Sequence, residues 1–334
     1  MNIKQNCNIY CALTPFHYFL ICQYFINDLK NDDKNILITN FSIQDIDARF
    51  KAVNCTHYAM PGKYGWELYI KNEYRKKLNY VVDNVAKIAG NCKEINLFAA
   101  VLINPISNGI YYCLKSNNGF SYINIPDGIA SVTTTRRDYK DYIKLYIKLL
   151  LSRIGLIKYS SFGDRMDSQG IYCANVIYSF LPHLIKNKTK AIIKRIDLRG
   201  EMQIGEDILF LGQPDVEERI EEALHFLYNN YSVNNIYYKP HHRENIEFIN
   251  KIEKNHNLKI ISTNKCIEDF FVTEKSFRIV IACFSSALIN LKMMFGDKVR
   301  CISYKGIDII DECRKEELLA LYNQFGVEII GWKE

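Results

Sequence analysis

Residues 207–220, DILFLGQPDVEERI, give the clearest indication of fold in this 334-residue chain. A short apolar run ends at Leu211, the turn Gly212-Gln213-Pro214 follows, and a charged amphipathic stretch begins at about Asp215. A strand joined to a helix by a glycine turn is typical of a parallel β-α-β unit. Pro214 and the acidic residues after it suit a first helical turn, because carboxylates are stabilised by the positive end of the helix dipole.

The same alternation of strand and helix patterns continues on both sides. Downstream, we predict strands at 235–239, 258–262, 278–283 and 299–303 and helices at 244–255, 267–272, 287–295 and 311–325. Upstream, we predict strands at 8–13, 35–39, 94–99 and 120–125 and helices at 16–29, 66–88 and 106–114. The charged stretch 185–201 shows little periodicity and is the predicted seam. The pattern predicts an α/β chain with the GT-B arrangement, two Rossmann-like domains (1–190 and 200–334) facing each other across a cleft.

Composition excludes several classes of protein. The formal charge of +6 is too small for a dedicated nucleic-acid binder, but it suits an anionic ligand such as a nucleotide sugar, or an acidic membrane surface. Eleven cysteines, an odd number with no C-x-x-C pair, favour free thiols in a reducing compartment. No apolar run is long enough to span a membrane, and no secretory signal is recognisable. We therefore expect a cytoplasmic protein, with the inner face of the plasma membrane as a candidate surface.

One segment departs from the alternating pattern. Residues 133–158 carry seven basic residues against two acidic ones, together with many apolar side chains at helical spacing. A basic amphipathic helix of this kind can lie in a membrane interface. An ordinary domain helix with a solvated lysine edge, or part of a homodimer contact, explains the same pattern.

A candidate base lies at the end of a predicted strand, in Pro126-Asp127-Gly128. Asp127 would project from the carboxyl end of the strand and take a proton from an attacking sugar hydroxyl. The alternative is structural, because Pro-Asp-Gly is a common turn sequence.

A candidate acid lies at the end of another predicted strand, in Lys239-Pro240-His241-His242. A histidine titrates near neutral pH, so His241 could donate a proton or hydrogen bond to a departing phosphate. Two adjacent histidines without a carboxylate or cysteine at a usual spacing make a weak metal site, and we predict no metal. A structural role for His242 stays open.

Two further candidates concern the nucleotide. Ser285 and Ser286 follow a predicted strand and begin a helix, where hydroxyls and backbone N–H groups can hold a phosphate, although serine is also an ordinary N-cap. Glu268 begins a short predicted helix and could bind ribose hydroxyls, as acidic residues do in nucleotide sites. A first-turn glutamate is also ordinary helix chemistry.

The order of these residues resembles that of the bacterial sialyltransferases, which share an acidic motif, a His-Pro motif and a Ser-Ser or Ser-Thr motif. The phrases LFLGQPDVEE and YYKPHHRE are most similar to glycosyltransferase family 52, which includes lipooligosaccharide sialyltransferases. Two departures are present: Pro126 replaces the first acid of the acidic motif, and His242 replaces the proline of His-Pro. The second departure leaves the choice between His241 and His242 open.

The resemblance implies an inverting, metal-independent enzyme that transfers sialic acid from CMP-sialic acid, with no cofactor. It implies a galactose-terminated oligosaccharide of the cell surface (lipooligosaccharide or capsule) as acceptor, joined at its 3-position. Asp127 would be the general base and His241 the acid. The donor would be bound by Gly212, Gln213, Lys239, Pro240, Glu268, Ser285 and Ser286.

Rival functions stay open from the sequence alone. Another transferase of the same fold would use a different nucleotide sugar, such as a UDP-hexose, or would add sialic acid as a capsule polymerase. A non-catalytic, membrane-associated scaffold would use residues 133–158 as its contact surface. Nucleic-acid binding is a third and weaker alternative, because the basic residues belong to no recognised module.

Overall fold

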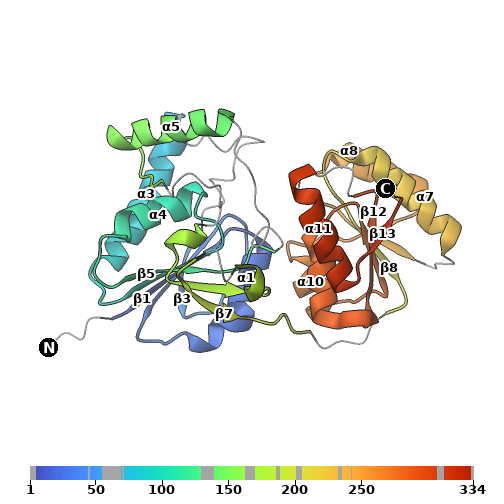
Figure 1. Cartoon of the computed structure of the whole chain (residues 1–334), viewed down its shortest axis with the longest axis horizontal. Helices are drawn as coiled ribbons and strands as arrows, with labels where there is room; N and C mark the ends of the chain where they lie inside the picture. The colour runs from blue at the N-terminus through green and yellow to red at the C-terminus, as the bar shows by residue number, and fades with distance from the viewer. Residues whose placement is uncertain are drawn as a thin grey trace. The chain divides into compact units, whose positions relative to one another are not determined.

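The computed structural model describes residues 5–43, 46–54, 69, 71–128, 139–161, 170–185, 189–200, 205–231, 235–241, 243–306 and 312–331. The chain divides into two compact units (Figure 1). The N-terminal unit comprises Met1–Asp127 with Thr134–Ile196, and the C-terminal unit comprises Gly128–Thr133 with Asp197–Glu334.

The N-terminal unit is built on a seven-stranded sheet in the order β3-β2-β1-β4-β5-β6-β7, in which every pair is parallel. Its strands are β1 (Cys7–Ala12), β2 (Lys34–Thr39), β3 (Phe50–Asn54), β4 (Ile95–Ala99), β5 (Phe120–Asn124), β6 (Val176–Ser179) and β7 (Ile192–Arg195). Its helices are α1 (Pro15–Tyr24), α3 (Asn72–Ala89), α4 (Pro105–Leu114), α5 (Tyr139–Arg153) and α6 (Pro182–Ile185), with short 3₁₀ turns η1 (Ile26–Asp28) and η4 (Ile171–Cys173).

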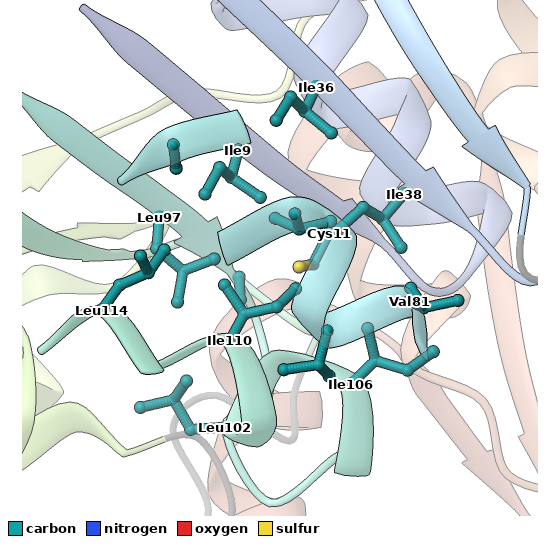
Figure 2. Packing of buried hydrophobic residues seen from close by; sticks show 14 of the residues in the cluster. Ile9, Cys11, Ile36, Ile38, Val81, Leu97, Leu102, Ile106, Ile110 and Leu114 are labelled. Carbon is teal, nitrogen blue, oxygen red and sulfur yellow. The ribbon is translucent and has the colours of Figure 1, made fainter. Parts of the chain in front are cut away.

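Both faces of this sheet are buried, as a parallel sheet requires. Alternate residues of β1 point to opposite faces, so Ile9 and Cys11 join one core cluster and Tyr10 joins another. Figure 2 shows the first cluster, where side chains of β1, β2 and β4 meet those of α3 and α4. On the other face, Tyr10 stacks on Phe98 with ring centroids 4.4 Å apart.

The C-terminal unit contains a six-stranded sheet in the order β10-β9-β8-β11-β12-β13, again with every pair parallel. Its strands are β8 (Ile208–Leu211), β9 (Ile236–Lys239), β10 (Lys259–Ile260), β11 (Ile279–Ala282), β12 (Arg300–Tyr304) and β13 (Glu328–Ile330). Its helices are α7 (Glu217–Asn230), α8 (Ile246–His256), α9 (Ile267–Thr273), α10 (Ser286–Phe295) and α11 (Glu312–Phe325), with a 3₁₀ turn η5 (Gly296–Lys298).

The predicted fold class, two parallel-sheet α/β domains, is confirmed. Several local predictions are wrong. The predicted helix 16–29 ends at Tyr24, and the 3₁₀ turn Ile26–Asp28 follows it. Helix α7 begins at Glu217 rather than near Pro214, because Asp215 adopts a left-handed conformation (φ 65°) that interrupts a helix. The stretch Ile192–Arg195, which was assigned to the seam, forms the edge strand β7.

None of the helices in the described part of the chain combines the length and the apolarity that crossing a membrane would require.

Candidate active site

The N-terminal unit places a histidine against Asp127. Asp127 lies three residues beyond β5, and His17 lies in the first turn of α1, directly after β1. Thr14 caps this helix, and its hydroxyl accepts a hydrogen bond from the His17 backbone N–H at 3.2 Å. The His17 Nε2 atom then lies 2.9 Å from Asp127 Oδ1. Residues 110 positions apart in sequence thus form an Asp-His pair.

The surroundings of this pair favour an ionised carboxylate. Burial alone raises the pKa of Asp127, but the hydrogen bond and charge of His17 outweigh it and hold the pKa below its ordinary value. An ionised carboxylate only accepts hydrogen bonds, so Nε2 of His17 carries the hydrogen that is shared. The other ring nitrogen, Nδ1, is buried and has no hydrogen-bond partner among the described residues.

Exposure decides which member of the pair can reach a substrate. The His17 side chain is 2% exposed and that of Asp127 is 30% exposed. Asp127 is therefore the member of the pair that a ligand could reach, and His17 lies behind it. His17 is not among the residues predicted from sequence. Its place in the first turn of the helix after β1 is the signal that would have found it, because that turn lies at the carboxyl edge of a parallel sheet.

Apart from Glu268, which lies on α9, the candidate residues of the C-terminal unit lie at the carboxyl ends of β8, β9 and β11. A partly buried carboxylate, that of Glu244, joins two of these loops. Glu244 accepts hydrogen bonds from the Tyr238 hydroxyl and from the backbone N–H of His241. A backbone hydrogen bond from Gln213 also lowers its pKa, yet burial is the larger effect and the pKa of Glu244 is raised overall. Glu244 was not predicted from sequence, although it ends the phrase YYKPHHRE, because its hydrogen-bond partners become visible only in the structure.

The Gly212-Gln213 turn fits closely into this arrangement. A Cβ atom at Gly212 would overlap Glu244 Oε2 and the Tyr238 hydroxyl, so a larger residue here would displace the hydrogen-bonded pair that these two side chains form. Gln213 Oε1 accepts a hydrogen bond from the Phe284 backbone N–H, which ties the β8 loop to the β11 loop. The structure therefore brings together the predicted residues Gly212, Gln213 and His241 and the loop that carries the serines.

The ring of His241 is oriented by its own loop. Its Nδ1 atom accepts a hydrogen bond from the Arg243 backbone N–H at 3.3 Å. In the neutral ring the hydrogen therefore resides on Nε2, which leaves Nε2–H as a donor. The alternative histidine, His242, lies outside the described residues.

The two predicted serines have different roles in the helix. Ser285 is the N-cap of α10, and its hydroxyl accepts a hydrogen bond from the Ala287 N–H at 3.2 Å. Ser286 is the first residue of that helix, and both side chains are partly exposed. The structure thus assigns the capping role to Ser285 and leaves Ser286 at the positive end of a ten-residue helix, where an anion is stabilised.

Glu268 is more deeply buried than a residue that contacts ribose needs to be. It is 4% exposed and accepts a hydrogen bond from Asn290 Nδ2 at 2.6 Å. Burial raises its pKa, while Asn290, Cys266 and the charge of Lys239 act in the opposite direction. Burial likewise lowers the pKa of Lys239, against the influence of Cys266 and Glu268. Lys239, Glu268 and Asn290 therefore form a second polar cluster; Asn290, on α10, was not predicted from sequence.

Comparison with protein families finds one model that matches most of the chain. The alpha-2,8-polysialyltransferase (POLYST) family matches residues 21–303. No curated protein is significantly similar in sequence.

Solved sialyltransferases share the fold. The alpha/beta-galactoside alpha-2,3-sialyltransferase of Photobacterium phosphoreum is 13% identical, with 98% of each chain covered and a TM-score of 0.58. The GT-B domain of a Photobacterium damselae sialyltransferase is 12% identical, with the same coverage and TM-score. A Photobacterium 2,6-sialyltransferase, solved with CMP and lactose, is 11% identical over 97% of this chain and 78% of its own, with a TM-score of 0.51. These likenesses confirm the GT-B fold class.

Because Glu268 is buried, its effect on stability can be measured separately from its effect on ligand binding. Because its pKa is raised above the usual 4.5, the folded protein loses stability as the pH rises from that value through the raised pKa. Glu268→Gln keeps an acceptor for Asn290 without the charge. We expect a higher free energy of unfolding than wild type at pH 8, by about 1 kcal/mol, and little difference near pH 4.

Urea unfolding at both pH values measures this effect, with the exposed Glu247→Gln on α8 as the matched control. Weaker nucleotide binding by the more stable Glu268→Gln protein is the expected companion result. Lower stability at pH 8 would show instead that the carboxylate supports the fold.

Proposed function

The chain belongs to the alpha-2,8-polysialyltransferase family, and on that premise we propose that it transfers sialic acid from CMP-sialic acid to a sugar hydroxyl of a surface glycan. The match over residues 21–303 carries the proposal, because this span contains Asp127 and all the candidate donor residues from Gly212 to Ser286. Membership of glycosyltransferase family 52 specifically stays a prediction.

The proposed base is Asp127. In the transfer, the acceptor oxygen attacks the anomeric carbon of the donor, and its proton passes to the carboxylate. The lowered pKa of Asp127 keeps this carboxylate ionised at neutral pH, and its hydrogen bond from His17 fixes one oxygen so that the other can face the acceptor. Attack on the face opposite the phosphate inverts the configuration at the anomeric carbon.

The proposed leaving-group site is in the C-terminal unit. As the bond from the anomeric carbon to the phosphate oxygen breaks, negative charge develops on CMP. The Nε2–H of His241, the Ser286 hydroxyl and the N-terminus of α10 would stabilise that charge. Lys239 and Glu268 would contact the nucleoside, with Pro240 and the Gly212-Gln213 turn beside it. These donors replace a cation in the scheme, so the proposed reaction needs neither a metal nor a cofactor.

The proposal also specifies the acceptor sugar. Family membership favours a terminal sialic acid, which would give an α-2,8-linked chain and agrees with the capsule-polymerase alternative raised from the sequence. A terminal galactoside joined at its 3-position, the acceptor first predicted, is the second candidate.

Nucleotide binding tests the donor site. Isothermal titration of the full chain is expected to show CMP binding that is unaffected by EDTA and much stronger than UDP binding. Ser286→Ala is expected to weaken CMP binding about tenfold at an unchanged thermal midpoint, whereas Ser285→Ala also lowers the midpoint because it removes the helix cap. Ser121→Ala in the N-terminal unit is the control.

Three outcomes would count against this donor site. Loss of CMP binding with EDTA would contradict metal independence. Preference for UDP would assign another nucleotide sugar, and an absence of binding would favour the scaffold function.

Product analysis tests the acceptor. With CMP-sialic acid as donor, a disialyl-terminated oligosaccharide and lactose are supplied together at equal concentration. We expect elongation of the sialylated acceptor at least about tenfold faster than sialylation of lactose, as the ratio of kcat/KM. The reverse ratio would establish the galactoside as acceptor, and mass spectrometry of the products distinguishes the two.

The Asp-His pair gives a prediction about pH. Asp127→Asn is expected to lower kcat at least about 100-fold, the usual range for loss of a general base, with CMP affinity unchanged. In His17→Phe the burial of Asp127 remains while the hydrogen bond is lost, so the Asp127 pKa rises. The acidic limb of the pH-rate profile should therefore move to higher pH.

His17→Gln is expected to restore part of the rate and of the original profile, because its amide can donate to Asp127. The exposed Asp32→Asn and His183→Phe are controls. An unchanged pH profile in His17→Phe would remove His17 from the mechanism.

A further inference from the structure

Large exposed hydrophobic side chains are concentrated in one segment of the N-terminal unit. Thirteen such side chains are exposed among the described residues, and seven of them lie between Tyr139 and Leu156. This segment comprises α5 and the turn after it (Figure 1). Single exposed hydrophobic residues are normal on a protein surface, whereas a cluster indicates an interaction site.

The unit's own core already uses the inward face of α5. Leu145 and Leu149 pack against the core cluster of the N-terminal sheet. The Lys148 ammonium lies 4.8 Å from the centroid of the Tyr69 ring and 5.4 Å from that of Tyr159. These contacts fix the rotation of α5 about its own axis, and this rotation determines which residues face outward.

The outward face is apolar and aromatic. Its residues follow the spacing i, i+4, i+7, i+11 and i+15, which keeps them on one side of a helix. They are Tyr139 (69% exposed), Ile143 (52%), Tyr146 (69%) and Leu150 (48%), with Ile154 (59%) directly after the helix, and we name them the α5 stripe. A surface helix ordinarily places polar residues opposite its buried face, so apolar side chains on both sides indicate a second burial partner.

Charge identifies the class of partner. Lys144, partly exposed, and Arg153, exposed, flank the α5 stripe, and residues 133–158 together carry seven basic and two acidic residues. Two copies of this helix face to face would bring like charges together, which disfavours self-association. An anionic bilayer instead offers negative headgroups to the basic flank and a boundary where aromatic rings are stabilised.

We propose that the α5 stripe binds the surface of an anionic phospholipid bilayer. The 15-residue helix has a length of about 22 Å, shorter than the roughly 30 Å hydrocarbon core, so it lies along the interface. The apolar stripe enters the boundary between headgroups and acyl chains while the flanking cations contact the lipid phosphates. This proposal is independent of the proposed reaction, because α5 contributes none of the candidate site residues.

Vesicle co-sedimentation of the full chain tests the proposal. We expect binding to phosphatidylcholine vesicles with 30% phosphatidylglycerol, at least about tenfold tighter than to pure phosphatidylcholine and weakened at 0.5 M salt. Ile143→Ser/Ile154→Ser is expected to weaken this binding at least about tenfold. The matched control, Ile192→Ser/Ile246→Ser, removes two isoleucines that are each 64% exposed and should bind like wild type.

A second variant, which changes charge and not the apolar stripe, tests the proposal even if the serine variant does not fold. Lys144→Glu/Arg153→Glu retains the stripe and is expected to lose the preference for phosphatidylglycerol. CMP affinity should be unchanged in all variants. Equal binding of the stripe variant and wild type, or equal binding to both vesicle types, would overturn the proposal. A wild-type dimer in light scattering that Ile143→Ser/Ile154→Ser converts to a monomer would also overturn it, by assigning the stripe to a second copy.

Discussion

Parallel pairing of every strand is the constraint on which both units depend. Parallel neighbours cannot be joined by hairpins, so each strand is followed by a crossover that returns the chain to the same starting edge. The crossovers cover both faces of the sheet, which makes the strands almost continuously apolar. Within each sheet, the carboxyl ends of all strands lie on the same side, and the backbone groups beyond them no longer pair with a neighbouring strand. Asp127, Gly212, His241 and Ser285 each follow the end of a strand for this reason.

The carboxyl groups of Glu244 and Glu268, in the same unit, differ in the hydrogen bonds that offset the free-energy cost of their burial. Glu244 is partly buried, and its oxygens accept hydrogen bonds from a tyrosine hydroxyl and from backbone N–H groups, so it supports the loops around it. Glu268 is buried with an amide partner and an elevated pKa, which is an energetic cost at neutral pH. A fold retains such a cost more readily where a ligand makes use of the charge. Both carboxyl groups have a raised pKa, and they differ in their surroundings: Glu244 is tied to loop groups, whereas Glu268 is almost fully buried beside Asn290.

Much of the fold could be predicted because apolar runs and helical periodicity are local properties. The strands around Leu211, Lys239 and Ala282 and the cap at Ser285 were predicted within a residue or two. Strands β3, β6, β7 and β13 were missed. Three of them, β3, β7 and β13, are edge strands, and an edge strand such as the exposed Ile192–Arg195 carries mixed charges and little burial signal. Strand β6 lies between β5 and β7 but has only four residues. Glu244 and Asn290 were not predicted, because each acquires its role from a partner that only tertiary structure supplies. His17 was also missed, although its place in the first turn of the helix after β1 is a signal that the sequence contains. Asp215 was misassigned because its positive φ follows from the turn that it completes.

The pairing of His17 with Asp127 has a consequence for the order of folding. The two residues are separated by 110 positions, and their strands β1 and β5 are not neighbours but flank β4. The histidine is therefore synthesised long before its partner, and it is buried against the carboxylate only after three strands have docked in register. The Asp-His contact closes a loop of 110 residues, and the entropy cost of closing it is offset by the strands that dock between its ends. The lowered pKa of Asp127 therefore depends on the pairing of β1, β4 and β5 in register.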